Sequence, residues 1–118
     1  MTRKPKDAIF RGDSLERLIA FPKPARASLG HNLDRVQVGE EPEDWKAMTG
    51  IGEGVYELRA RVDKQAYRVA YIARFAEAIY VLHAFEKKTQ KTSPKDKSLI
   101  EQRFADLVRE RKEKGIDR

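Results

Sequence analysis

The spacing at which hydrophobic residues recur changes several times along the chain, and the clearest pattern lies near the middle of the chain. In residues 55–62 apolar and charged residues alternate, which is typical of a strand with one buried face. A turn at residues 63–66 leads into a second alternating stretch, residues 67–74. Residues 78–85 are apolar at both odd and even positions, as expected of a central strand covered on both sides. We therefore expect three consecutive antiparallel strands.

Two helices are predicted before these strands, because apolar residues there recur every three or four positions. The first takes Asp13 or Ser14 as its N-cap and is limited by Pro22. The second begins near Pro24 and stops at Gly39. This hairpin is expected to cover one face of the sheet through Leu15, Leu18 and Ile19 of the first helix and Ala25, Leu29, Leu33 and Val36 or Val38 of the second.

A third helix is predicted after the strands, with Pro94 in its first turn and Thr92 or Ser93 as its cap. Residues 7–11 are a further candidate for an edge strand. The order of elements predicts a single α+β domain over residues 1–118. Its expected architecture is a small antiparallel β-sheet with an N-terminal helical hairpin and a C-terminal helix.

The segment between the second helix and the first long strand is irregular. Residues 40–44 form an acidic loop broken by a proline, and Trp45, Met48 and Ile51 are expected to anchor the segment to the core. Glycines at positions 50, 52 and 54 allow sharp turns. A phosphate-binding glycine loop is the alternative, but the lysine spacing of a Walker motif and a following helix are both lacking. We interpret the segment as a connection.

Composition limits the chemistry that the chain can perform. It has no cysteine and only two histidines, far apart, which excludes disulfides and thiolate sites and argues against a metal centre. We expect no metal and no small-molecule cofactor. No apolar run approaches the roughly 20 residues that span a bilayer, and the first residues lack the apolar stretch of a secretory signal. A cytoplasmic protein without membrane contacts is expected.

The net charge of +6 is concentrated near the C-terminus. Residues 1–86 hold 14 Lys or Arg against 13 Asp or Glu, whereas residues 87–118 hold 11 against 6. Such an excess favours a polyanionic partner, either nucleic acid or the acidic surface of a protein. A solvated charged face that maintains solubility is the alternative.

Several cationic residues are expected to share one surface of the sheet. Arginine binds two phosphate oxygens in a fork and lysine acts as a mobile point charge, so such a surface fits a phosphodiester. Crowded cations also lower the pKa of a lysine in general, which makes lysine a usable acid or base. The predicted members are Arg59 and Arg61 beside Glu57 on the first strand, Arg68 across the hairpin, and Lys87, Lys88 and Lys91 with the hydroxyls of Thr89 and Thr92 after the last strand.

Structural interpretations of the same residues remain open. Glu57 with Arg59 or Arg61, and Glu86 with a lysine, form ordinary exposed ion pairs under this interpretation, worth less than about 1 kcal/mol each. His83 lies inside the apolar strand and is either a packed core histidine or, since it shares parity with Lys87, a member of the site.

Three motifs resemble those of a known family: VYELR at residues 55–59, YRV at 67–69 and HAFEKKTQKT at 83–92, followed by a helix that starts with proline. They resemble the RelE/HigB-like toxins of bacterial type II toxin-antitoxin systems, and most closely the phage-derived HigB-like branch, over residues 7–114. The resemblance implies an mRNA endoribonuclease, or mRNA interferase, that acts at the ribosome. Attack of the ribose 2′-hydroxyl on the adjacent phosphate would leave a 2′,3′-cyclic phosphate. It also implies a cognate HigA-like helix-turn-helix antitoxin.

The resemblance also implies a role for each residue that matches a motif of the family. Arg59 ends the E-L-R motif and Arg68 belongs to Y-R-V, and both would contact the scissile phosphate. Lys87 and Lys88 match the paired lysines after the aromatic strand, and they or Lys91 would supply the general acid or base. Many relatives use a tyrosine or histidine near the C-terminus, and this chain has neither after His83. Candidate RNA- or phosphate-binding residues are Arg61, Lys91, Thr89 and His83.

Two functions without catalysis are alternatives. A non-catalytic RNA- or ribosome-binding protein of phage origin would use the same cationic surface. Its binding would weaken steeply with salt, because phosphate contacts release counterions, and no cyclic phosphate would form. A structural protein with a solvated basic helix would show no salt-sensitive binding of RNA.

Overall fold

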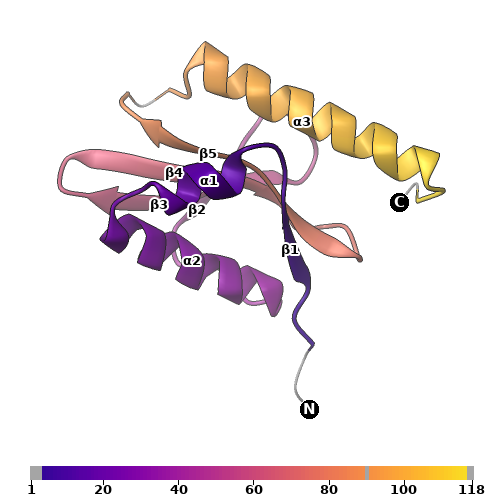
Figure 1. Cartoon of the computed structure of the whole chain (residues 1–118), viewed down its shortest axis with the longest axis horizontal. Coiled ribbons are helices and arrows are strands. Elements are labelled where there is room, and N and C mark those ends of the chain that lie inside the picture. Colours follow the sequence, from indigo (N-terminus) through magenta and orange to yellow (C-terminus); the bar gives the residue numbers. More distant parts are fainter. Residues whose placement is uncertain (1–3, 90, 117–118) are drawn as a thin grey trace.

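The computed structural model describes residues 4–89 and 91–116. In this part of the chain a mixed sheet is flanked by helices (Figure 1), which confirms the α+β class expected from the sequence. The elements in chain order are β1 (Asp7–Phe10), α1 (Ser14–Ile19), α2 (Lys23–Gln37), β2 (Trp45–Ala47), β3 (Val55–Val62), β4 (Gln65–Ile72), β5 (Ala78–Lys87) and α3 (Pro94–Glu113).

The sheet has the strand order β1-β5-β4-β3-β2. Strands β2 to β5 pair antiparallel, but β1 runs parallel to β5, so the expectation of a purely antiparallel sheet was wrong in this respect. A hairpin turn dictates antiparallel pairing only between strands that it joins. β1 and β5 are separated by most of the chain, and no turn sets their relative direction.

Helices cover both faces of the sheet, α1 and α2 on one side and α3 on the other (Figure 1). Each face has its own core, which confirms that β5 is buried on both sides. Burial of this apolar surface is the main stabilising contribution to the fold. Leu29, Leu33, Leu58, Val69 and Val81 belong to the core beneath α2, and Ile72, Leu82, Phe85, Ile100 and Leu107 to the core beneath α3.

The buried face of α1 differs from the predicted one. Leu18 is buried, but Leu15 is 44% exposed and Ile19 58% exposed, so the prediction was wrong for these two residues. Instead Ser14 is fully buried, and its hydroxyl donates a hydrogen bond to the carbonyl of Val81, 3.3 Å away. A helix of six residues completes too few turns to bury a full apolar stripe.

The irregular segment before β3 contains β2, a short edge strand that the sequence pattern did not reveal. Met48 is buried as expected, and Ile51 packs against the core beneath α3. Trp45 is 40% exposed, because it lies on this edge strand and contacts Tyr56 edge-on, with ring centroids 5.3 Å apart. Trp45 therefore reaches the core through Tyr56 and leaves much of its own side chain exposed.

A bulge interrupts the pairing of β4 with β5. His83 is paired with Ala70 and Val81 with Tyr71, so that Leu82 is an extra residue on β5. Side chains along a strand alternate between the two sides of the sheet. After an extra residue, the odd-numbered residues therefore face the side that the even-numbered residues faced before it.

The bulge decides on which side the end of β5 presents its lysine. Before it, Tyr80 and Leu82 belong to the core beneath α3; after it, Phe85 belongs to that same core. Lys87 follows Phe85 by two residues and faces the same side of the sheet. It thus lies on the α3 side, beyond the part of the sheet that α3 covers.

Helix α3 begins beside this lysine and is capped by Ser93, one of the two predicted caps. The Ser93 hydroxyl accepts a hydrogen bond from the backbone N–H of Asp96 and donates one to its carboxylate, over 3.1 and 2.8 Å. We expect Ser93→Ala to lower the free energy of unfolding by about 1 kcal/mol. Urea denaturation measures this, with Thr92→Ala as the matched control expected to change little. Equal losses in the two variants would contradict the assignment of the cap.

Candidate functional site

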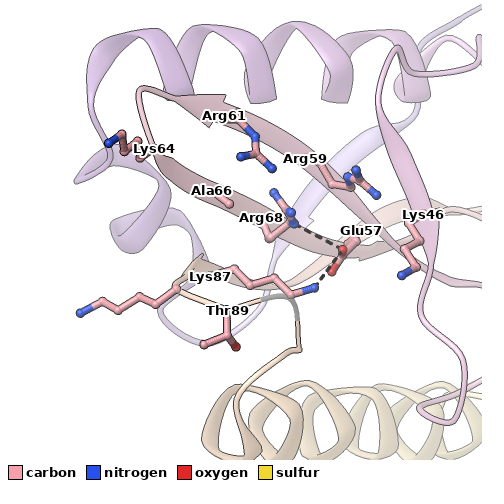
Figure 2. Close-up of a pocket in the computed structure, with 10 residues that line it drawn as sticks. Lys46, Glu57, Arg59, Arg61, Lys64, Ala66, Arg68, Lys87 and Thr89 are labelled. Atoms are coloured by element: carbon pink, nitrogen blue, oxygen red, sulfur yellow. Dashed lines mark ion pairs between the residues drawn. The ribbon is translucent and has the colours of Figure 1, made fainter.

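Charged side chains from three adjacent strands meet on the α3 side of the sheet. The ladder places Arg59 of β3 directly opposite Arg68 of β4, and Ala66 of β4 between Arg61 of β3 and Lys87 of β5. Cross-strand neighbours lie about 5 Å apart, so these cations share one surface. In Figure 2 the three arginines line β3 and β4, and Lys87 extends across toward Glu57.

This surface is hollowed into a cleft of about 400 Å³. Seven of the described residues that line it are Lys or Arg, and one is acidic. Such a strongly cationic concave surface attracts polyanions and focuses their approach. The lining residues are Lys46, Glu57, Arg59, Arg61, Lys64, Ala66, Arg68, Lys87, Lys88 and Thr89.

Glu57 lies at the centre of the cleft. The alternative interpretation, in which Glu57 forms an exposed ion pair with Arg59 or Arg61, was therefore wrong. The Glu57 side chain is only 3% exposed, because Arg68 and Lys87 close over it. One carboxylate oxygen, Oε1, lies 3.3 Å from Arg68 Nε and 3.6 Å from Lys87 Nζ (Figure 2). The small Ala66 and Ala70 on the intervening strand leave room for these long side chains. A single buried carboxylate thus holds two cations at fixed positions.

Arg59 is held from the other side of the cleft. Its Nε lies 3.3 Å from a carboxylate oxygen of Asp44, and its backbone N–H donates to the Asp44 carbonyl. The Nε atoms of Arg59 and Arg68 are buried, yet neither has a hydrogen-bond acceptor in good geometry among the described residues. Buried donors without an acceptor are costly. Because these Nε atoms are buried, an anion in the cleft would meet the outer nitrogens of the two guanidinium groups instead.

The pKa of Arg68 is lowered by its surroundings in the cleft. Burial lowers the pKa of its guanidinium, Glu57 raises it in opposition, and Arg59 and Arg61 lower it further. Like charges directly opposite in a ladder repel each other. The guanidinium stays charged at neutral pH because its ordinary pKa is so high. A bound phosphate would add negative charge to a cleft whose lining holds seven cations and one carboxylate.

His83 does not face the cleft. Its side chain is fully buried, stacked on Phe85, with Nε2 2.7 Å from a carboxylate oxygen of Asp96. Nδ1 lies 3.3 Å from a guanidinium nitrogen of Arg103, which can only donate, so Nε2 carries the proton that is given to Asp96. The predicted contact of His83 with RNA is therefore corrected, because no part of the ring is accessible. His83 instead fastens β5 to the start of α3.

The buried imidazole predicts a pH dependence of stability. Burial lowers the pKa of His83 below its ordinary value of 6.5, although Asp96 raises it in opposition. The folded state then binds a proton less readily than the unfolded state, so stability is full above about pH 6.5 and falls as the pH drops below it. We expect urea midpoints at about pH 7.5 and about pH 5 to differ more in wild type than in His83→Asn. An equal difference in both proteins would contradict this origin.

The remaining predicted residues occupy two adjoining clefts. Lys88 and Thr89 are exposed and line the first, and the Thr89 hydroxyl donates to the backbone carbonyl of Lys91. Lys91 lines a second cleft with Thr92. Lys46 was not predicted because it arrives through the short β2. The structure thus brings together Arg59, Arg61, Arg68, Lys87, Lys88 and Thr89, places Lys91 next to them, and leaves His83 outside.

Fold and cleft together define a small α+β domain with a strongly cationic cleft on the α3 side of its sheet. The family described as "Phage derived protein Gp49-like (DUF891)" matches residues 16–105, and the chain belongs to this family, which is of the RelE-like toxin type. A search of curated proteins finds no match. Within the described residues no helix is long and apolar enough to cross a membrane, and no three His, Asp or Glu side chains gather as metal ligands would.

Proposed function

We propose that this protein is the toxin of a type II toxin-antitoxin system, of the HigB-like branch. It acts in the cytoplasm as an endoribonuclease that cleaves translated mRNA at the ribosome. The observation that carries this proposal is the convergence of Arg59, Arg68 and Lys87 from three strands around the buried Glu57. Membership in a RelE-like family supports the same reaction.

The proposed substrate is a phosphodiester flanked by a ribose 2′-hydroxyl. The 2′-oxygen attacks phosphorus, the bond from phosphorus to the 5′-oxygen breaks, and a 2′,3′-cyclic phosphate remains. Negative charge grows on the phosphate oxygens in the transition state. Arg59 and Arg68, whose guanidinium groups line the cleft from adjacent strands, are placed to bind these oxygens. Preorganised donors of this kind stabilise developing charge without reorganisation.

Proton transfer requires one acceptor and one donor. The 2′-hydroxyl must lose a proton, and the leaving 5′-oxygen must gain one. Charged lysine and arginine have no acceptor, whereas an ionised carboxylate is an acceptor only. Among the residues that line the cleft, Glu57 is the carboxylate. We propose that Glu57 accepts the proton of the 2′-hydroxyl and that Lys87 or Lys88 donates a proton to the leaving 5′-oxygen.

This assignment revises the expectation of a lysine as base. Lys87 Nζ faces a carboxylate at 3.6 Å, and its side chain is only 8% exposed. The ammonium group has N–H donors and no acceptor. Lys87 is therefore suited to donate a proton or to stabilise charge, while Lys88, exposed at the rim, can reach an entering strand.

A HigA-like helix-turn-helix antitoxin is the proposed partner, and it would cover the cationic cleft. Acidic side chains of that partner would take the place of the phosphates. Co-expression with a short helix-turn-helix protein encoded by a neighbouring reading frame, where there is one, tests the pairing. Restored growth together with a complex that survives gel filtration would support it, and growth arrest that persists would contradict it.

Induced expression and RNA mapping test the activity itself. We expect growth arrest, cuts within translated mRNA, and 3′ ends that carry a 2′,3′-cyclic phosphate. In a purified ribosome assay, cleavage should be unchanged by a chelator that removes transition metals but leaves the Mg²⁺ that ribosomes need. If wild type neither arrests growth nor cuts translated mRNA, the enzyme proposal fails. Loss of cleavage with such a chelator while translation continues would contradict a reaction that is independent of transition metals.

A non-catalytic RNA- or ribosome-binding function is the second candidate. It is favoured by the burial of His83 and by the lack of tyrosine and histidine after it, since a nuclease of this type commonly needs such a group. Salt-sensitive binding of RNA without any cyclic-phosphate product would support this candidate.

A further inference from the structure

A second cleft of about 380 Å³ adjoins the first on the α3 side of the sheet. The two share Lys46, Glu57 and Lys87, so the ion pair between Glu57 and Lys87 forms the ridge between them. The catalytic scheme proposed above uses only the first cleft and this ridge. The second cleft remains without a role in that scheme.

The lining of the second cleft differs from that of the first. Its cations are all lysines, including Lys91 after β5 and Lys97 in the first turns of α3, whereas the first cleft contains three arginines. Lysine acts as a point charge and does not demand a fixed orientation of the phosphate. Met48 and Ile51 contribute an apolar floor, with Met48 buried and Ile51 packed on the core. Positive charge above an apolar floor matches a nucleotide, whose base is flat and apolar on its faces and whose phosphate is anionic.

We infer that the second cleft binds the nucleotide next to the scissile phosphate, with its base against Met48 and Ile51 and its phosphate beside Lys91 and Lys97. The inference rests on the proposed RNA substrate and extends it, because it requires a single strand that crosses the ridge. Continuity of the two clefts through Lys87 supports this path. The smallest tightly bound substrate is then an oligonucleotide that reaches both clefts, rather than one phosphodiester.

Binding of short oligonucleotides to the full chain tests this path without interference from cleavage. The probes are 2′-fluoro RNA strands of increasing length, which lack the attacking hydroxyl. For wild type we expect a step in affinity at the length that reaches the second cleft. The variant Lys91→Ala/Lys97→Ala should lose that step, roughly tenfold in affinity, and its salt dependence should be shallower by about 1.4 in the slope of log K against log salt.

The matched control is Lys95→Ala/Lys112→Ala, which removes the same two charges from exposed positions that line neither cleft. It should retain both the step and the salt slope. Removing the base from the added nucleotide should also lower the affinity, because the apolar floor then has no partner.

The outcomes separate the inference from the proposed function. If wild type binds and cleaves RNA but the two double variants behave alike, the second cleft is not on the path of the strand. An abasic nucleotide that binds as tightly as an intact one would overturn the contact with the floor. If wild type binds no oligonucleotide and cleaves no RNA, the proposed function falls as well.

Discussion

Lys87→Ala is expected to reduce RNA cleavage by about 10²–10³-fold, the range seen when one donor to a developing negative charge is removed. The lysine lies 3.6 Å from Glu57 and lines both clefts, so under the proposed mechanism its loss removes a cation and a candidate proton donor at the reacting phosphate. Cleavage of a translated reporter mRNA measures the effect, and growth after induction reports it in cells. Arg59→Ala should lose activity for a related reason, because it removes a guanidinium that we propose holds the phosphate.

Lys95→Ala is the matched control, since it removes one exposed lysine that lines neither cleft. Its cleavage rate should remain within twofold or so of wild type. The fold should survive Lys87→Ala, because Glu57 keeps Arg68 as its partner. A Lys87→Ala protein that still arrests growth like wild type would exclude a catalytic role for Lys87.

Glu57→Ala is expected to lower the free energy of unfolding by about 3 kcal/mol, because it leaves two buried cations without their common partner. The side chains of Glu57, Arg68 and Lys87 are 3%, 10% and 8% exposed, so water can compensate only a small part of the loss. Urea denaturation at neutral pH measures this effect. Loss of cleavage would accompany it, which makes Glu57→Ala alone insufficient to assign a chemical role.

Glu57→Gln separates the two effects of Glu57. An amide oxygen carries a partial negative charge and would still face the cations of Arg68 and Lys87, so we expect a smaller loss of stability than in Glu57→Ala. An amide is a very weak base, so cleavage should remain strongly impaired while the affinity for 2′-fluoro RNA is retained or increased. Glu101→Gln, on the exposed surface of α3, controls for the change in net charge. Wild-type cleavage by Glu57→Gln would exclude Glu57 as the proton acceptor.

Much of the fold could be predicted because the sequence signals are local. The clean alternation of β3 and the proline that starts α3 fix the type of each element without reference to the rest of the chain. β2 escaped prediction because three residues carry too little periodicity. The parallel direction of β1 depends on partners most of the chain away, which no local pattern encodes.

The candidate site shows the same division. Alternation correctly placed Arg59 and Arg61 on one face of β3, and the ladder brought Arg68 beside them. Burial of Glu57 could not be predicted, because it results from side chains of two other strands closing over it. The same holds for His83. Its position in the apolar strand allowed either a packed core histidine or a member of the site, and only the contact with Asp96 on α3 decides between the two.

The extra residue in β5 makes the site depend on where along this strand a residue is lost. Deletion of Leu82 would remove the bulge and leave Lys87 opposite Ala66, because the residues after the bulge keep their partners on β4. Deletion of Ala84 or Phe85, by contrast, would shift every later residue by one position and turn Lys87 toward α2. Net charge would stay the same, yet the cluster around Glu57 would lose one of its two cations. Relatives that are shorter by one residue at the bulge are therefore expected to keep the cluster, whereas relatives that are shorter by one residue between the bulge and Lys87 are not.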